Sequence, residues 1–116
     1  MELIGEEKDP LGLSAGDAGA KLDSGKVRAG LVVGDFANAI LAVAEVGTFG
    51  ASKYSPKGWL SVPNGIERYD DAMLRHFLKE QAGELRDKDS GLLHRAHFAW
   101  NALATLELKL RGENNG

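Results

Sequence analysis

The chain contains no cysteine and no long uninterrupted run of apolar residues. The absence of cysteine excludes disulfides, thiolate zinc sites and a cysteine nucleophile, and it leaves the redox compartment open. The absence of a long apolar run argues against a membrane span, and no basic-then-apolar leader follows Met1. We therefore predict a cytoplasmic protein without a membrane partner.

The chain also lacks a large excess of charge of either sign, because 14 basic and 17 acidic side chains nearly balance to a net charge of −3. General polyanion binders take their affinity from phosphate neutralisation, so a nucleic-acid partner is not expected. A local cluster of cations still allows a small phosphorylated ligand. With 116 residues the chain makes one domain with one core. A deep active site in such a domain is expected to borrow walls from a second subunit.

The apolar residues recur at helical spacing, and no segment shows strand-like alternation, so the sequence predicts an all-α fold, a small helical bundle. The expected layout is a flexible arm over 1–20, a single helical domain over 21–111 and a flexible tail over 112–116. Within the domain we expect helices from near Asp35 through Glu45, over 70–87 and over 92–111, with a long ordered loop over 50–66. Gly47 and Gly50 are expected to end the first helix, and Gly112 the third.

Two leucine-rich stripes are the predicted core of the second and third helices. They are Leu74, Phe77, Leu78, Gln81 and Leu85 on the second helix, and Leu103, Leu106 and Leu110 on the third.

Polar side chains form a second pair of stripes. At 100° per residue His76, Glu80, Glu84 and Asp87 fall within about 80° of one another on a helix. On the next predicted helix His94, His97 and Asn101 follow at i, i+3 and i+7. If the two helices pair as an antiparallel hairpin across the Asp89-Ser90-Gly91 turn, carboxylates face imidazoles and an amide. This arrangement predicts a divalent-metal pocket.

Each part of this pocket also has a simpler interpretation. Carboxylates three residues apart, such as Glu84 and Asp87, occur on any solvated helix face. His94 and His97 would then be a capping residue and a hydrogen-bonded core histidine. If the pocket holds a metal, oxygen ligands suit Mg²⁺ or Mn²⁺, and an added imidazole favours Mn²⁺ or another transition metal.

The predicted loop carries lysines and aromatics, namely Lys53, Tyr54, Lys57 and Trp59. In a nucleotide site the lysines would contact phosphates and an aromatic ring would stack on the base. In the alternative, Trp59 fills the core beneath the loop and the lysines are solvated. Around Gly25, the cations Lys21, Lys26 and Arg28 are more typical of a surface charge run. The pair Gly25-Lys26 lacks the other residues of a P-loop.

Taken together, the motifs resemble those of a known family. They are Lys21-Leu-Asp23-Ser-Gly25-Lys26-x-Arg28; Gly50-Ala-Ser-Lys53-Tyr54 with Gly58-Trp59; Leu74-Arg75-His76; Gly83-Glu84-x-x-Asp87-x-Asp89-Ser90-Gly91; and His94-x-x-His97-x-Ala99-x-Asn101. This ordered set, from Lys21 to Leu110, resembles the phage-borne dATP/dGTP diphosphohydrolase family, which is grouped with the MazG-like all-α nucleoside triphosphate pyrophosphatases.

The resemblance implies a helical bundle that forms a homodimer or homotetramer. It also implies Mg²⁺- or Mn²⁺-dependent cleavage of a (d)NTP to the monophosphate and pyrophosphate, in a host cytoplasm if the protein is phage-encoded. MazG-like enzymes typically carry Glu-x-x-Glu on one helix and Glu-x-x-Asp on the next. Here Glu84-x-x-Asp87 serves as the first pair, with Glu80 one turn earlier, and the second position holds His94-x-x-His97.

The resulting hypothesis is hydrolysis at the α-phosphorus of a purine (d)NTP, dGTP or dATP. The expected catalytic residues are Glu80, Glu84 and Asp87; the metal ligands are Glu80, Glu84, Asp87, His94 and His97; the substrate-binding residues are Lys21, Lys26, Lys53, Lys57, Trp59, Arg75 and Asn101. Glu80 or Glu45 would take the proton of the attacking water, and Trp59 or Tyr54 would stack on the base. The alternative function is a non-catalytic helical module that binds nucleotides or drives oligomerisation.

Overall fold

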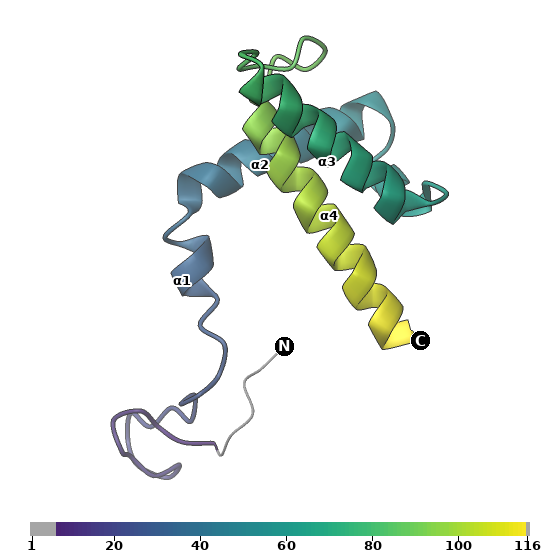
Figure 1. Cartoon of the computed structure of the whole chain (residues 1–116). Coiled ribbons are helices and arrows are strands. Elements are labelled where there is room, and N and C mark those ends of the chain that lie inside the picture. The colour runs from purple at the N-terminus through teal and green to yellow at the C-terminus, as the bar shows by residue number, and fades with distance from the viewer. Residues whose placement is uncertain (1–6, 116) are drawn as a thin grey trace. The chain divides into compact units, whose positions relative to one another are not determined.

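The computed structural model describes residues 7–115 of the chain, with side chains described up to residue 112. It confirms the all-α prediction, and no strand occurs in this range (Figure 1). The elements are α1 (Gly30–Val33), α2 (Ala37–Lys53), the 3₁₀ turn η1 (Gly58–Ser61), α3 (Gly65–Gln81) and α4 (His94–Asn115). Among the helices of the described residues, none combines the length and apolarity needed to cross a bilayer.

The chain divides into two units, residues 1–36 and 37–116, each of which is described by itself. In the first unit, of which residues 1–6 lie outside the described range, Asp9 is buried and organises the turns around it. Its two carboxylate oxygens accept hydrogen bonds from the backbone N–H groups of Leu11 and Lys21, both at 2.7 Å. The Lys26 ammonium lies 3.6 Å from Glu7. Thus Lys21 and Lys26 both lie in this unit.

The second unit is built on the pairing of α3 with α4, and α2 packs on α4. Glu80 pairs with Arg95, Phe77 packs on Phe98 and Tyr69 on Trp100, so residue numbers fall along α3 as they rise along α4. The two helices are therefore antiparallel, as the predicted hairpin required (Figure 1).

The prediction that Gly47 and Gly50 end the first helix is wrong, because α2 continues to Lys53. Gly47 has a packing role instead, since a Cβ at this position would lie 3.3 Å from Nε1 of Trp100. A glycine inside a helix costs only about 1 kcal/mol relative to alanine, which tertiary packing readily offsets. The prediction that Gly112 ends the third helix is also wrong, because α4 continues past Gly112 to Asn115.

The second helix lies earlier than predicted, at Gly65–Gln81 and not 70–87. Asn64, in the left-handed region at φ 54°, precedes it, and Gly83, at φ +107°, follows its end. Glycine adopts positive φ without steric cost, so the chain leaves the helical path there. Glu84 and Asp87 consequently lie on the connection to α4. The loop predicted over 50–66 is shortened at its start by α2 and at its end by α3, and it contains η1.

The leucine-rich stripes are not the core of this chain. Leu74, Leu78 and Leu85 are 52%, 62% and 62% exposed, and Leu103 and Leu106 are 55% and 53% exposed. Of the predicted stripe on α3, Phe77 is partly covered, together with His76 and Glu80, because this face of α3 packs on α4. Among the described residues the buried apolar side chains are only Val46, Ala96 and Ala104.

Candidate metal and nucleotide site

The connection between α3 and α4 is a tight, well-bonded turn. Backbone hydrogen bonds join Asp87 N–H to Leu92 O at 2.8 Å and His94 N–H to Leu85 O at 3.0 Å. At its tip, the Asp87 carboxylate accepts hydrogen bonds from the backbone N–H groups of Ser90, at 2.8 Å, and Asp89, at 3.1 Å. The turn therefore fixes Asp87 Oδ2 at the start of α4.

Two imidazoles meet beside this turn. Nδ1 of His76, on α3, lies 2.8 Å from Nδ1 of His94, the first residue of α4. The other nitrogen of His94, Nε2, lies 3.0 Å from Oε1 of Glu84. Because a carboxylate only accepts, Nε2 of His94 is the donor. In the neutral ring Nδ1 of His94 therefore presents its lone pair toward His76.

His97 lies on the other side of His76 and is held by a different partner. Its ring stacks on His76 with centroids 4.3 Å apart and an interplanar angle of 7°. Nε2 of His97 lies 2.7 Å from Oγ of Ser90, the same residue whose backbone N–H binds Asp87. His97 is buried, and so is His94, which is fully inaccessible to solvent. All three histidines of the chain thus meet in one cluster.

The cluster keeps two of these imidazoles neutral. Burial lowers the pKa of His76 to about 4, and the neighbouring His97 and His94 add to this effect. Burial also lowers the pKa of His97, against the opposing charge of Asp87. A neutral imidazole has a lone pair free for a metal or a proton. These shifts place the histidines in the state that a ligand needs.

The two carboxylates of the cluster are held ionised. Burial alone would raise the pKa of Asp87, but the hydrogen bonds from Ser90 outweigh it, so the pKa is lowered. The hydrogen bond from His94 lowers the pKa of Glu84. One ligand atom from each of His76, Asp87 and His94 lies within 4.8 Å of the others. Two imidazoles and a carboxylate form a donor set suited to a divalent transition metal.

Other predicted site residues of this unit lie around the cluster. Glu80 forms a forked ion pair with Arg95, through Nε at 3.3 Å and Nη2 at 2.5 Å. Asn101 is buried and its amide donates to the backbone oxygen of His97 at 2.8 Å, so it braces α4. Arg75 is exposed on α3.

Lys53, the last residue of α2, is held against the turn. Its ammonium lies 2.6 Å from the Asp89 carboxylate, and this hydrogen bond raises the pKa of Lys53. Lys57 is exposed just before η1. Trp59 lies within an aromatic cluster, with Trp100 edge-on at 5.9 Å and Tyr69 tilted at 6.5 Å, while the Tyr69 hydroxyl donates to Trp59 O. Within the second unit, the structure brings Lys53 to the turn and packs Trp59 against α3 and α4.

An open groove of about 470 Å³ adjoins the cluster. Ser90 lines it and also contacts Asp87 and His97, which ties the groove to the imidazoles. The remaining lining residues are Leu41, Ala44, Glu45, Thr48, Phe49, Ser52 and Leu92. Its size falls within the range of small-molecule sites, which is about 300–1,000 Å³.

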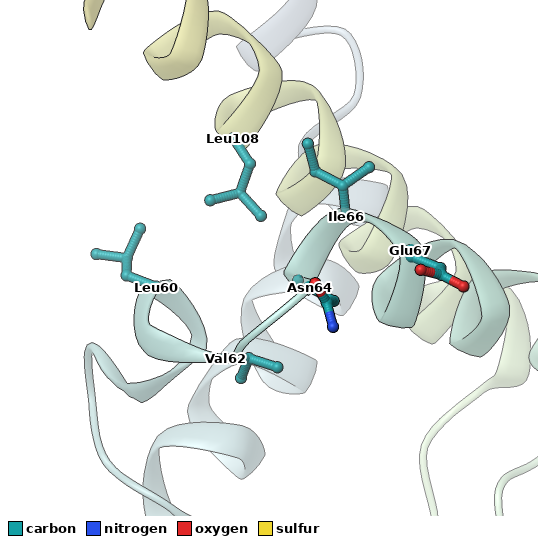
Figure 2. Close-up of a pocket in the computed structure, with 7 residues that line it drawn as sticks. Leu60, Val62, Asn64, Ile66, Glu67 and Leu108 are labelled. Carbon is teal, nitrogen blue, oxygen red and sulfur yellow. The ribbon is translucent and has the colours of Figure 1, made fainter.

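A second open groove, of about 380 Å³, lies at the other end of α3 (Figure 2). Its labelled lining residues are Leu60, Val62, Asn64, Ile66, Glu67 and Leu108. The leucine, isoleucine and valine side chains dominate this groove, and Glu67 is its only charged residue. Neither groove is lined by a cation, and what distinguishes the first is its connection to the imidazole cluster through Ser90.

Sequence reasoning left His76 out of the metal ligands, although it placed His76 on the same stripe as Glu80. The signal was present in the spacing of the stripe, but only the packing of α3 on α4 shows which imidazoles meet. Arg95 was not singled out at all. As the residue after His94, it gave no sequence signal that it would pair with Glu80.

Comparison with known proteins gives one match. The model of the family described as dATP/dGTP diphosphohydrolase, N-terminal, matches residues 16–115. No curated protein and no solved structure matches the chain.

Proposed function

The chain belongs to the dATP/dGTP diphosphohydrolase N-terminal family, and we propose that it hydrolyses a purine (d)NTP, dGTP or dATP, to the monophosphate and pyrophosphate. The observation that carries this proposal is the meeting of His76, Asp87 and His94 within 4.8 Å, beside a groove that Ser90 connects to them. A metal-binding donor set next to a nucleotide-sized groove is the arrangement that phosphoryl chemistry requires.

The residues present fit a divalent ion, because Asp87 is held ionised and His76 is held neutral next to His94. When bound, Mg²⁺ or Mn²⁺ would neutralise phosphate charge and lower the pKa of an attacking water. In this proposal Asp87 and His94, which the sequence also predicted, are the central ligands.

The chain's own cations would orient and neutralise the triphosphate. Lys53 already contacts a carboxylate oxygen of Asp89, and a phosphate oxygen would offer it the same kind of charge-assisted hydrogen bond. Lys57 and Arg75 are exposed in the same unit and are proposed to contact the triphosphate as well. Asn101 acts in this proposal by bracing the backbone of His97.

The proton of the attacking water needs an acceptor. The two predicted candidates differ in their surroundings: Glu80 is held by Arg95, whereas the side chain of Glu45 lines the groove and has no polar partner among the described residues. An unpaired carboxylate is free to reorient toward the water, whereas both oxygens of Glu80 are engaged by Arg95. We therefore favour Glu45 as the general base.

A homodimer or homotetramer is part of the proposal. Among the described residues only three apolar side chains are buried, while Leu74, Leu78, Leu103 and Leu106 are more than half exposed. Exposed apolar residues recurring on helix faces are typical of subunit interfaces. Burying them in an oligomer would supply the core that one chain lacks.

The decisive experiment is incubation with each of the eight common NTPs and dNTPs, with Mg²⁺ or Mn²⁺, and separation of the products. We expect pyrophosphate and the monophosphate of a purine (d)NTP. Orthophosphate as the sole primary product would exclude cleavage at the α-phosphorus. Binding of a nucleotide without any product would favour the alternative, a non-catalytic nucleotide-binding module.

A further inference from the structure

We propose that His76, Asp87 and His94 form the metal site through Nδ1 of both imidazoles, that Glu84 orients His94 without binding the ion, and that the site selects a transition metal over Mg²⁺. The inference deepens the proposed function by naming the class of its cofactor. It adds His76, which the family resemblance did not assign, and it moves Glu80, Glu84 and His97 out of the set of ligands.

The first argument is the distance between the two imidazoles. Nitrogen ligands bound to one transition-metal ion at about 2.0–2.1 Å lie about 3 Å from each other. The Nδ1 atoms of His76 and His94 are 2.8 Å apart, and a carboxylate oxygen of Asp87 completes a group whose members all lie within 4.8 Å. In the metal-free protein Nδ1 of His76 donates to Nδ1 of His94, so metal binding requires the hydrogen of His76 to move to its Nε2. Apart from this change of tautomer, the side chains need only small adjustments to converge on one ion.

The second argument is the hydrogen bond on the far side of His94. Metal-binding histidines almost always donate their other ring N–H to a carboxylate or carbonyl, which fixes the tautomer and directs the free lone pair at the ion. His94 Nε2 makes this bond to Glu84 at 3.0 Å. Because Glu84 contacts Nε2 while His76 meets Nδ1 of the same ring, Glu84 lies on the wrong side of the ring to be a ligand.

Glu80 and His97, which the sequence predicted as metal ligands, are each held by another partner. Glu80 is occupied by the forked contact with Arg95. Nε2 of His97 is occupied by Ser90 Oγ at 2.7 Å, and its ring stacks flat on His76 at 4.3 Å. His97 thus holds the plane of His76 and, through Ser90, the position of Asp87. We assign it as a positioning residue.

The choice of metal follows from the donors. Mg²⁺ prefers oxygen ligands and retains several waters, whereas Mn²⁺, Co²⁺ and Zn²⁺ accept imidazole. Two imidazoles and one carboxylate are also the ligand set of many non-redox and redox transition-metal sites with open positions. Such a site would bind its ion in the absence of any nucleotide.

The test measures metal binding alone, using the full chain after chelator treatment. Calorimetric titration with Co²⁺, together with the visible absorption of bound Co²⁺, is carried out on wild type, His76→Gln, Asp87→Asn, His97→Gln and Glu84→Gln. Glu107→Gln is the matched surface control, because Glu107 pairs only with Arg111 one turn away on α4. Circular dichroism and melting temperature establish that each variant is folded.

We expect one Co²⁺ per chain for wild type and the control, and no saturable binding of Mg²⁺ without nucleotide. His76→Gln and Asp87→Asn should lose at least about a hundredfold in Co²⁺ affinity, and Glu84→Gln about ten- to a hundredfold with a largely retained spectrum. His97→Gln should retain the spectrum with a loss of at most about tenfold. His94 is fully buried, so His76→Gln carries the histidine test even if a His94 variant does not fold.

The proposal is overturned if wild type binds no Co²⁺, if folded His76→Gln binds it as wild type does, or if Glu84→Gln or His97→Gln abolishes the spectrum. The experiments distinguish failure of the metal-site proposal from failure of the proposed (d)NTP hydrolysis. Co²⁺ bound at these residues without cleavage of any (d)NTP would refute the function and leave the metal site in place. Pyrophosphate release by His76→Gln at the wild-type rate would refute the metal site and leave the function in place.

Discussion

His94 donates its Nε2 hydrogen to Glu84 at 3.0 Å, and this one bond directs the other ring nitrogen of His94 at His76. The Glu84 side chain is 32% exposed, whereas His94 is fully buried. A partly exposed carboxylate thus sets the tautomer of a buried imidazole. It follows that Glu84 affects the site by orientation, and that its loss should be partly repaired by supplying more metal.

Glu84→Gln should lower activity about ten- to a hundredfold at limiting Mn²⁺, because Gln has a neutral acceptor in place of the carboxylate. Raising the Mn²⁺ concentration should restore most of the turnover. The measurement is activity across a metal titration, with the concentration of half-maximal activation as the readout. No recovery at saturating metal would mean that Glu84 takes a direct part in the reaction.

Asp87→Asn should abolish turnover, by at least about a hundredfold, and excess metal should not restore it. The amide oxygen can still accept the N–H groups of Ser90 and Asp89, so the turn is expected to keep its structure. Kinetics and melting temperature are measured together. Near-wild-type activity of this variant at any metal concentration would show that the site has been placed wrongly.

Lys53→Ala should weaken (d)NTP binding roughly fivefold to a hundredfold, the scale of a charge-assisted hydrogen bond. The substitution also breaks the ion pair with Asp89, so Asp89→Asn is the matched control. Asp89→Asn removes the same ion pair but leaves the Lys53 ammonium free to bind the substrate. Equal increases in KM for both variants would assign the effect to the ion pair and not to phosphate binding.

Trp59→Ala distinguishes a scaffold from a stacking platform. Trp59 packs on Tyr69 and Trp100, so we expect a loss of about 3 kcal/mol or more in the free energy of unfolding. If the Trp59 ring instead stacks on the base, Trp59→Ala raises KM and leaves the melting temperature unchanged. Tyr69→Phe, which removes only the hydroxyl bond to Trp59 O, serves as the control. Denaturant melts and KM for both variants decide between the two roles.

Leu78→Lys should reduce self-association if the exposed leucines form the subunit interface. Leu78 is 62% exposed in the single chain, so a lysine there is tolerated by the fold but would place an unpaired charge in a dimer contact. Light scattering over a range of concentrations measures the assembly. A wild-type protein that is monomeric and fully active at nanomolar concentration would contradict the oligomer.

The sequence was sufficient for the fold class and for the neighbourhood of the site. Helical periodicity and the absence of strand alternation predicted the all-α structure, and the spacing of the polar residues predicted that imidazoles on one helix face polar groups of the other. Both follow from local rules, the 3.6-residue period and the short Asp89-Ser90-Gly91 connection, and neither requires knowledge of distant contacts.

Helix ends and buried faces could not be predicted in the same way. Gly47 was expected to terminate a helix, yet it lies inside α2 because Trp100, over 50 residues later in sequence, packs against it. The leucines of α3 and α4 were expected to form the core, yet the α3–α4 contact uses the face with His76, Phe77 and Glu80. Propensity and periodicity identify an apolar stripe, but not what covers it.

By itself, then, the sequence determined that this is a helical protein with a concentration of histidine and carboxylate side chains around one turn, and its motifs carry the family membership over residues 16–115. Only the tertiary structure decided which of these groups meet. His76 comes to 2.8 Å from His94 because α3 and α4 pair antiparallel, and Glu84 comes to the far side of the same ring because Gly83 turns the chain out of the helix. Ligand geometry depends on contacts between elements, and those are fixed by packing and not by spacing along the chain.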